Sequence, residues 1–393
     1  MVSGKWIAGL LVSGLICSNA PQVQAFQPRS VTQSYASQTN VFEPSSTFRL
    51  LAQSSDNPTL SDAEQEALDD LLSEGQDKVD AGDYSGAIAL YQQATNIDPA
   101  NARLYSGIGY LYVQQALYAE AIAPYQQAIT LEPDNLPFRY GLAYAYVQME
   151  SYTEAIAAYQ AITEFAPREA DAYLGLGNIY ITLEDYDAAL LTYETLTRIA
   201  PGNAQAYEAL GTLYLLQEDY EAARDEFQRA LNNDRSRSQP YIGLAETQLA
   251  LGDKDGAFFN LQQAVELNPN AAEAQFLLGE LAKEQGDEDA AYGYYSRAVA
   301  ADPSLIAAQA AVGAMHLERG AHLQAVTAYR EIISVFPDNA GARYNLGLAL
   351  WGSGLERRAI NAMQVARSLY LQQDDLSGVD RVDALLEFWD VEL

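Results

Sequence analysis

Gly177 to Pro201 reads GNIYITLEDYDAALLTYETLTRIAP, and this stretch decides the fold because it belongs to a pattern that recurs every 34 residues. Steps of 34 residues from its central alanine meet another alanine each time, in both directions. This column comprises Ala87, Ala121, Ala155, Ala189, Ala223, Ala257, Ala291, Ala325 and Ala359. A period of this length is typical of a solenoid made of stacked structural units.

Two further columns keep the same register. A proline closes most units, and a small residue precedes the alanine of each unit. The prolines are Pro99, Pro133, Pro167, Pro201, Pro269, Pro303 and Pro337, with Arg235 in place of proline in one unit. The small residues are Gly75, Gly109, Ala143, Gly177, Gly211, Ala245, Gly279, Gly313 and Gly347.

Each unit has the spacing of a helical hairpin. Apolar residues around Leu176 and Tyr180 recur at three and four residues, and the acidic turn 184–186 interrupts them. A second helical stretch follows from about 186 to 199, and Pro201 ends it. We expect a large ring such as Tyr193 to fill the space beside the small columns, and each hairpin to stack on the next because it cannot bury its apolar face alone.

These residues resemble the tetratricopeptide repeat (TPR) family. The family's marks appear in one unit as Tyr173, Leu176-Gly177, Tyr180, Ala189, Tyr193 and Pro201. The resemblance implies an all-α, right-handed superhelical solenoid of helix–turn–helix repeats. Nine units follow from the register: 68–101, 102–135, 136–169, 170–203, 204–237, 238–271, 272–305, 306–339 and 340–373. The motif is specific for the fold but not for a function.

The start of the chain predicts export. Residues 1–25 contain a basic residue at Lys5, an apolar stretch from Trp6 to Cys17 and a small-x-small cleavage site ending at Ala25. We therefore expect a signal peptide and a periplasmic protein. Lipidation at Cys17 is disfavoured because Ile16 precedes it, and an uncleaved anchor is the minor alternative.

The rest of the chain divides into three parts. Residues 26–60 are rich in Ser, Thr and Gln without sustained periodicity, which predicts a flexible leader. Ser61 and Glu64 have capping-box spacing and open the repeat region 61–373. In 374–393 we expect Ser377 to cap a last helix whose apolar face covers the final unit as a lid, or, alternatively, docks a partner. That face contains Val379, Val382, Leu386 and Trp389.

Composition excludes several functions. The formal net charge of −31 at pH 7 argues against nucleic acid and anionic lipid as main partners, and it favours basic protein segments or divalent cations. The only cysteine is Cys17, so the mature chain has no disulfide, and its two histidines argue against a zinc site. No nucleophile–base constellation is recognisable, so we expect a protein without enzymatic activity.

The resemblance also implies where partners bind. In TPR arrays the first helix of each unit lines a concave groove, at positions two, five, nine and twelve. Those positions place aromatic hydroxyls at one end of the groove, acidic and amide side chains in the middle and aromatic rings at the other end. The partner-binding candidates are Tyr110, Tyr140, Tyr144, Asn178, Glu208, Tyr344 and Trp351. Rigid tyrosine rings suit an extended peptide.

The acidic middle of the groove allows three interpretations. It is a solvated charged face, a complement to a basic peptide, or a site for Mn²⁺ or Ca²⁺, which prefer carboxylate oxygens. Glu246 and Glu280 occupy equivalent positions in adjacent units and are the best pair for one ion. No cofactor is required, and Mn²⁺ is the candidate metal.

Other local motifs have structural explanations. The fifth positions of the units contain no Lys or Arg, so the basic clamp that holds chaperone C-termini in some TPR domains is missing. The acidic stretches 253–256 and 287–289 resemble the start of a calcium loop but sit where a turn and a helix cap belong. His316 is expected inside the array and His322 in an inter-helix turn.

The complete plan resembles the periplasmic processing-associated TPR proteins of cyanobacteria. It combines a signal peptide, a leader, nine units and strong acidity. This resemblance implies a factor in early photosystem II assembly that engages the C-terminal region of a reaction-centre precursor and delivers Mn²⁺. The alternatives are an envelope scaffold without metal, in secretion or surface assembly, and a regulatory subunit of an enzyme complex. Contact with a membrane is expected only through a partner or an uncleaved signal.

Overall fold

The computed structural model describes residues 60–391, and every regular element in that range is an α-helix. The predicted signal peptide and almost all of the predicted leader lie outside the described residues. The described residues divide into two compact units, 60–213 and 214–391. We call the described parts the amino-terminal unit (60–213) and the carboxy-terminal unit (214–391), and describe each by itself.

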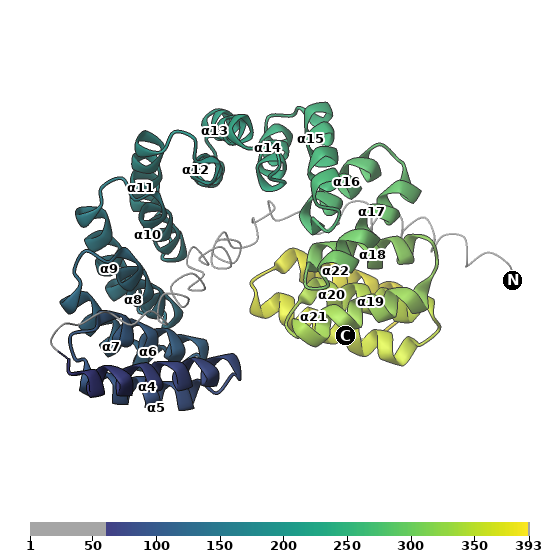
Figure 1. The fold of residues 1–393 in the computed structure, drawn as a ribbon. Coiled ribbons are helices and arrows are strands. Elements are labelled where there is room, and N and C mark those ends of the chain that lie inside the picture. The colour runs from purple at the N-terminus through teal and green to yellow at the C-terminus, as the bar shows by residue number, and fades with distance from the viewer. Residues whose placement is uncertain (1–59, 392–393) are drawn as a thin grey trace, which may run out of the picture. The chain divides into compact units, whose positions relative to one another are not determined.

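The amino-terminal unit contains four helical hairpins and most of the helix that opens the fifth. Figure 1 shows its helices following one another in chain order. They are α4 (Asp62–Asp80), α5 (Tyr84–Ile97), α6 (Ala102–Gln114), α7 (Tyr118–Leu131), α8 (Leu136–Gln148), α9 (Tyr152–Phe165), α10 (Ala170–Thr182), α11 (Tyr186–Ile199) and α12 (Ala204–Leu216), which continues into the carboxy-terminal unit.

The carboxy-terminal unit continues the pattern and adds one helix at the end. Its elements are α13 (Tyr220–Asn233), α14 (Gln239–Ala250), α15 (Lys254–Leu267), α16 (Ala272–Glu284), α17 (Glu288–Ala301), α18 (Ile306–Glu318), α19 (His322–Val335), α20 (Ala340–Gly352), α21 (Glu356–Gln372) and α22 (Leu376–Phe388). None of the helices among residues 60–391 has the length and apolarity that crossing a bilayer requires.

The hairpins begin and end where the sequence predicts. Ser61 and Glu64 form a complete capping box at the start of α4. In the unit that defines the repeat, α10 ends at Thr182, Glu184 turns the chain in the left-handed region with φ 57°, and the Asp185 side chain accepts a hydrogen bond from the Ala188 amide to start α11. These local signals produce the nine predicted helix pairs.

The core is built on the predicted columns. All nine alanines of the central column have exposed fractions of 0 %. The small column admits the large ring of its own unit, because a Cβ on Gly177 would lie 2.5 Å from the Tyr193 ring. The expectation that a large ring such as Tyr193 fills the space beside this column is therefore confirmed.

A second small column, which the sequence analysis missed, admits the ring of the preceding unit. A Cβ on Gly141 would lie 2.4 Å from the Tyr125 ring, and one on Gly175 would lie 2.5 Å from the Tyr159 ring. The Tyr125 ring thus contacts glycines of two successive first helices, Gly109 on α6 and Gly141 on α8. Each such ring packs against the first helices of two successive units. The residues that define the repeat are therefore also the residues that pack one unit on the next.

Helix α22 covers the last hairpin. Val379, Val382, Leu386 and Trp389 are buried, and Trp389 stacks on Trp351 with ring centroids 4.0 Å apart. Arg367 of α21 also donates two hydrogen bonds to Asp383 of α22. The prediction that Ser377 caps this helix is wrong. Asp375 caps it by accepting from the Gly378 amide, and Ser377 lies inside the first turn.

Candidate functional site

A cluster of half-buried tyrosines covers part of the amino-terminal unit. It consists of Tyr84 on α5, Tyr110 on α6, Tyr118 on α7 and Tyr144 on α8, which we call the tyrosine face. The rings of Tyr118 and Tyr144 meet edge to face, with centroids 6.4 Å apart. The 34-residue repeat relates Tyr84 to Tyr118 and Tyr110 to Tyr144, so each of four successive helices carries one tyrosine of the face.

The hydroxyls of this face lie within electrostatic reach of one another. Burial raises the pKa of Tyr110, and the nearby Tyr84 raises it further. Burial and then Tyr118 raise the pKa of Tyr144 in the same way. Beneath them, the pKa of Tyr125 is raised by burial and then by Tyr110 and Tyr144. Tyr84 thus lies near Tyr110 and Tyr118 near Tyr144, and the buried Tyr125 ring lies near both Tyr110 and Tyr144.

Three of the predicted partner-binding residues are buried instead of exposed. Tyr140, Asn178 and Glu208 have exposed fractions of 8 %, 5 % and 1 %. The Tyr140 hydroxyl donates to Glu169 at 3.2 Å, and its ring packs edge to face against Tyr159. The correction is that these side chains are buried, Tyr140 by contacts inside its own repeat, and offer a partner little surface.

The Asn178 interaction explains part of this burial. Asn178 accepts a hydrogen bond from the hydroxyl of Tyr193, the large ring of the same unit. The ninth position of a first helix is thus reached from below by the ring of the second helix. Counting positions along the repeat places Asn178 on one face of its helix. It does not show that the Tyr193 hydroxyl of the second helix already donates a hydrogen bond to that side chain.

The two candidate metal ligands have different neighbours. Burial, and then repulsion from Glu273, raises the pKa of Glu246 to about 8. The carboxylate of Glu280 accepts a hydrogen bond from the Tyr295 hydroxyl. Within residues 60–391 no group of three or more His, Cys, Asp or Glu side chains is arranged to hold a metal ion. Because the pKa of Glu246 is raised, a metal ion must compete with a proton for this carboxylate.

The aromatic end predicted in the last unit is partly covered. Tyr344 and Trp351 are half-buried and pack against the core cluster of the last repeats. Because Trp389 of α22 stacks on Trp351, one face of that indole contacts the chain itself. Burial raises the pKa of Tyr344.

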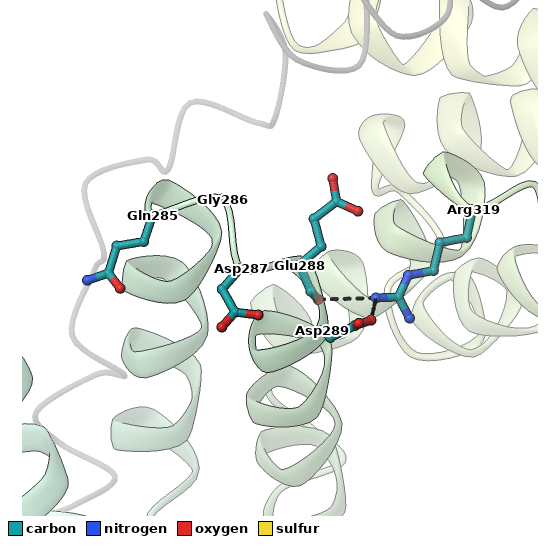
Figure 2. A pocket seen from close by; sticks show the side chains of 6 residues that line it. All are labelled: Gln285, Gly286, Asp287, Glu288, Asp289 and Arg319. Carbon is teal, nitrogen blue, oxygen red and sulfur yellow. Dashed lines mark hydrogen bonds and ion pairs between the residues drawn. The ribbon is translucent and has the colours of Figure 1, made fainter.

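A polar pocket of about 510 Å³ lies at the turn before α17 (Figure 2). Asp287 there accepts from the Ala290 amide, as a helix cap does. Arg319 donates to the Asp289 carboxylate at 2.8 Å and to the Glu288 carbonyl at 3.2 Å, so it ties this turn to the next unit. The expectation that 287–289 is a structural cap is confirmed.

The two histidines lie on successive helices of one hairpin. His316 is half-buried and packs edge to face on Tyr292, with centroids 5.5 Å apart. Burial lowers the pKa of His316, and Arg319 lowers it further. His322 is the first residue of α19, and its ring lies against Gly352. Both imidazoles are thus packing groups of the carboxy-terminal unit.

Comparison with protein families gives matches along most of the chain. Models described as tetratricopeptide repeat match residues 102–135, 140–204, 181–240, 242–306 and 316–372, and one described as TPR repeat matches residues 75–116. A search of curated proteins found no match.

Solved structures of repeat proteins resemble parts of the chain. A tetratricopeptide repeat protein from Parabacteroides merdae is 18 % identical, with a TM-score of 0.48 over 64 % of this chain and 99 % of that one. The C-terminal part of a TPR protein from Cytophaga hutchinsonii is 16 % identical, with a TM-score of 0.48 over 61 % and 98 %. YrrB, described as a TPR protein with an unusual peptide-binding site, is 22 % identical, with a TM-score of 0.39 over 48 % and 96 %.

Proposed function

Because the chain belongs to the tetratricopeptide repeat family, which comprises scaffolds for protein–protein interaction, we propose that it is an exported, non-enzymatic scaffold whose tyrosine face binds protein partners. The observation that carries this proposal is the array of half-buried rings on four successive helices. Such rings bury a large area while they lose little conformational entropy, which suits docking of a polypeptide.

Export is supported by the sequence of residues 1–25, with its basic start, apolar stretch and cleavage site at Ala25. We therefore place the mature protein in the periplasm, with Phe26 as its first residue. Cell fractionation followed by amino-terminal sequencing tests this directly. Recovery of the full-length chain from the cytosol contradicts it.

A finer form of the proposal concerns photosystem II. The plan of the chain resembles PratA, the processing-associated TPR protein of cyanobacteria, and we propose that this protein likewise engages the C-terminal region of a reaction-centre precursor. The test uses a peptide of that region and the mature protein. Binding that is lost in Tyr110→Leu with Tyr144→Leu, and kept in the control Tyr294→Leu of the carboxy-terminal unit, supports the proposal. Binding that ignores the tyrosine face contradicts it.

Delivery of Mn²⁺ is the metal-dependent part of this finer form. Net acidity and the equivalent positions of Glu246 and Glu280 support it. Because the pKa of Glu246 is raised to about 8, specific Mn²⁺ binding through this residue is expected to strengthen between pH 6.5 and 8.5. Calorimetric titration at both pH values, with Glu246→Gln and Glu280→Gln as the double variant, tests this. Binding that stays stoichiometric in the double variant contradicts the site.

The alternative is a scaffold without metal, in secretion or surface assembly. The bond from Tyr295 to Glu280 favours this alternative, because that carboxylate already has a structural role. If the titration shows only weak, salt-sensitive Mn²⁺ binding, the scaffold without metal is the correct form of the proposal. The role of the tyrosine face is the same in both forms.

A further inference from the structure

We propose that the tyrosine face binds a proline-rich segment in the polyproline II conformation that carries Lys or Arg side chains, with contacts at every third residue. This inference rests on the proposed function and names the class of partner for the same surface. It follows from the spacing of the rings, from the chemistry that they present and from the charge of the unit that holds them.

The spacing expected for the packed helices that carry Tyr110 and Tyr144 matches the period of a polyproline II helix. Tyr110 and Tyr144 occupy the same position in successive repeats, and their helices α6 and α8 pack against each other. Packed helices lie about 8–10 Å apart. A polyproline II helix has three residues per turn and rises about 3.1 Å per residue, so its equivalent side chains recur about every 9 Å. Tyr84 and Tyr118 likewise occupy the same position in successive repeats, as the first residues of α5 and α7.

The chemistry of the face suits the same ligand. Its surface consists of ring faces, which pack on pyrrolidine rings, and of hydroxyls, which can donate to carbonyls. The backbone of a polyproline II helix makes no internal hydrogen bonds, so its carbonyls are available to such donors. Strand addition needs a free sheet edge, and residues 60–391 contain helices as their only regular elements.

Charge determines the second property of the ligand. The amino-terminal unit contains many acidic residues, but its only basic residues are Lys78, Arg103, Arg139, Arg168 and Arg198. Internal contacts already hold several of these: Lys78 pairs with Asp83 at 3.1 Å, and Arg139 lies over the Phe165 ring. The unit therefore attracts cations and repels anionic segments. Lys and Arg side chains of a ligand would also pack on tyrosine rings as cation–π pairs.

The experiment uses the mature protein and three twelve-residue peptides. The probe is Pro-Pro-Arg repeated four times. One control replaces both prolines by glycine and keeps the charge, and the other replaces arginine by glutamine and keeps the prolines. We expect calorimetry to show the probe binding at least tenfold more tightly than either control, with affinity that falls as NaCl rises from 50 to 300 mM.

Variants of the protein test whether the probe binds at the tyrosine face. Tyr110→Leu with Tyr144→Leu should weaken the probe at least tenfold, whereas Tyr294→Leu in the carboxy-terminal unit should leave it unchanged. Circular dichroism checks that the variants fold. If the double variant loses helicity, Tyr84→Leu with Tyr118→Leu replaces it, because these rings form the neighbouring row of the same face. Tyr110→Phe with Tyr144→Phe keeps the ring faces and should weaken the probe less than the leucine pair.

Four outcomes overturn the inference. They are equal affinity for the glycine control, loss of binding in Glu246→Gln with Glu280→Gln instead of the tyrosine variants, no binding of any peptide, and self-association that the tyrosine variants abolish, which would make a second copy the occupant. In the third case, a physiological partner that still binds through Tyr110 and Tyr144 leaves the proposed function intact. Failure of that partner to require these tyrosines removes the proposed function as well.

Discussion

The two units of the chain have the same core but solve the turn between paired helices differently. In each unit of the repeat, the second residue after the first helix adopts a left-handed conformation. In most of the amino-terminal unit non-glycine residues occupy this position, namely Ala116, Glu150 and Glu184 with φ of 55–57°. The exception there is Gly82. The carboxy-terminal unit has Glu218 at its first such position and glycine in the later repeats, at Gly252, Gly286, Gly320 and Gly354.

The contacts between successive repeats differ as well. In the amino-terminal unit they include neutral hydrogen bonds, such as Ser85 to Gln115 at 2.9 Å. In the carboxy-terminal unit ion pairs span successive repeats, as between Arg319 and Asp289 at 2.8 Å and between Lys254 and Glu284. The comparison teaches that the alanine, glycine and ring columns specify the fold, whereas turns and surfaces are free to carry separate chemistry.

The largest expected effect tests whether the two cores are equivalent. Tyr193 and Tyr329 are both fully buried, one in each unit. Replacing either by alanine leaves a cavity and should cost about 3–5 kcal/mol of unfolding free energy. Hydrogen exchange of the two units measures this loss locally. A loss below about 1 kcal/mol in one unit alone would show that its ring does not hold the stack.

Overpacking the alanine column should have the next largest effect. Ala189 has no exposed surface, so Ala189→Leu should cost about 1–3 kcal/mol. The control Ala123→Leu lies at an exposed position and should change stability by less than about 0.5 kcal/mol. Denaturant titrations of both variants compare them. An unchanged midpoint for Ala189→Leu would mean that the register is wrong.

The pH dependence should differ between the units because of Glu246. Its pKa is about 8 in the folded state and near 4.5 in the unfolded state, so the folded state binds the extra proton between these values. Stability from this group is fully present below about pH 4.5 and is lost as pH rises through 8. Glu246→Gln should therefore stabilise the carboxy-terminal unit more at pH 8.5 than at pH 5. Equal effects at both pH values would refute the raised pKa.

The turn position gives a smaller and opposite pair of effects. Gly286→Glu places a side chain in the left-handed region and should cost about 1 kcal/mol. Glu184→Gly relieves the same conformation, but the gain is reduced by the greater freedom of glycine in the unfolded chain. Thermal melts of both variants compare the turns. Equal changes of the same sign in the melting temperature of both variants would contradict the left-handed conformation at this turn position.

The ion pairs between repeats should have the smallest effect. Lys254 and Glu284 are both largely exposed, so Lys254→Met should cost no more than about 1 kcal/mol, and less at high salt. Ser85→Ala removes a neutral contact in the other unit and should respond little to salt. Denaturant titrations at 50 and 500 mM NaCl measure both differences. A larger salt response for Ser85→Ala would reverse the comparison.

Much of the fold could be predicted because the residues that specify it recur at a fixed period in the sequence. The alanine column, the hairpins and the apolar face of α22 follow from spacing alone. The second glycine column was missed, although Gly141 and Gly175 are themselves 34 residues apart, because their role needs a ring from the preceding unit. The choice between Asp375 and Ser377 as the cap was also beyond the pattern, since both residue types favour that position.

The candidate site was harder to predict than the fold. Burial of Tyr140 and Glu208 depends on packing in three dimensions, which no single column records. The tyrosine face could be recognised only in part. Tyr110 and Tyr144 were identified from their positions on first helices, but Tyr84 and Tyr118 begin second helices and come beside them only in three dimensions. A site formed by side chains from both helices of a hairpin therefore needs the structure.

The central claim is that partners dock on the tyrosine face of the amino-terminal unit, and site-specific photocrosslinking in the native cell tests it most directly. A benzoylphenylalanine would replace Tyr110 in one strain, Tyr144 in a second and Glu246 in a third. The account predicts that the same partner is crosslinked from positions 110 and 144 and not from 246. Crosslinking from 246 alone would contradict it.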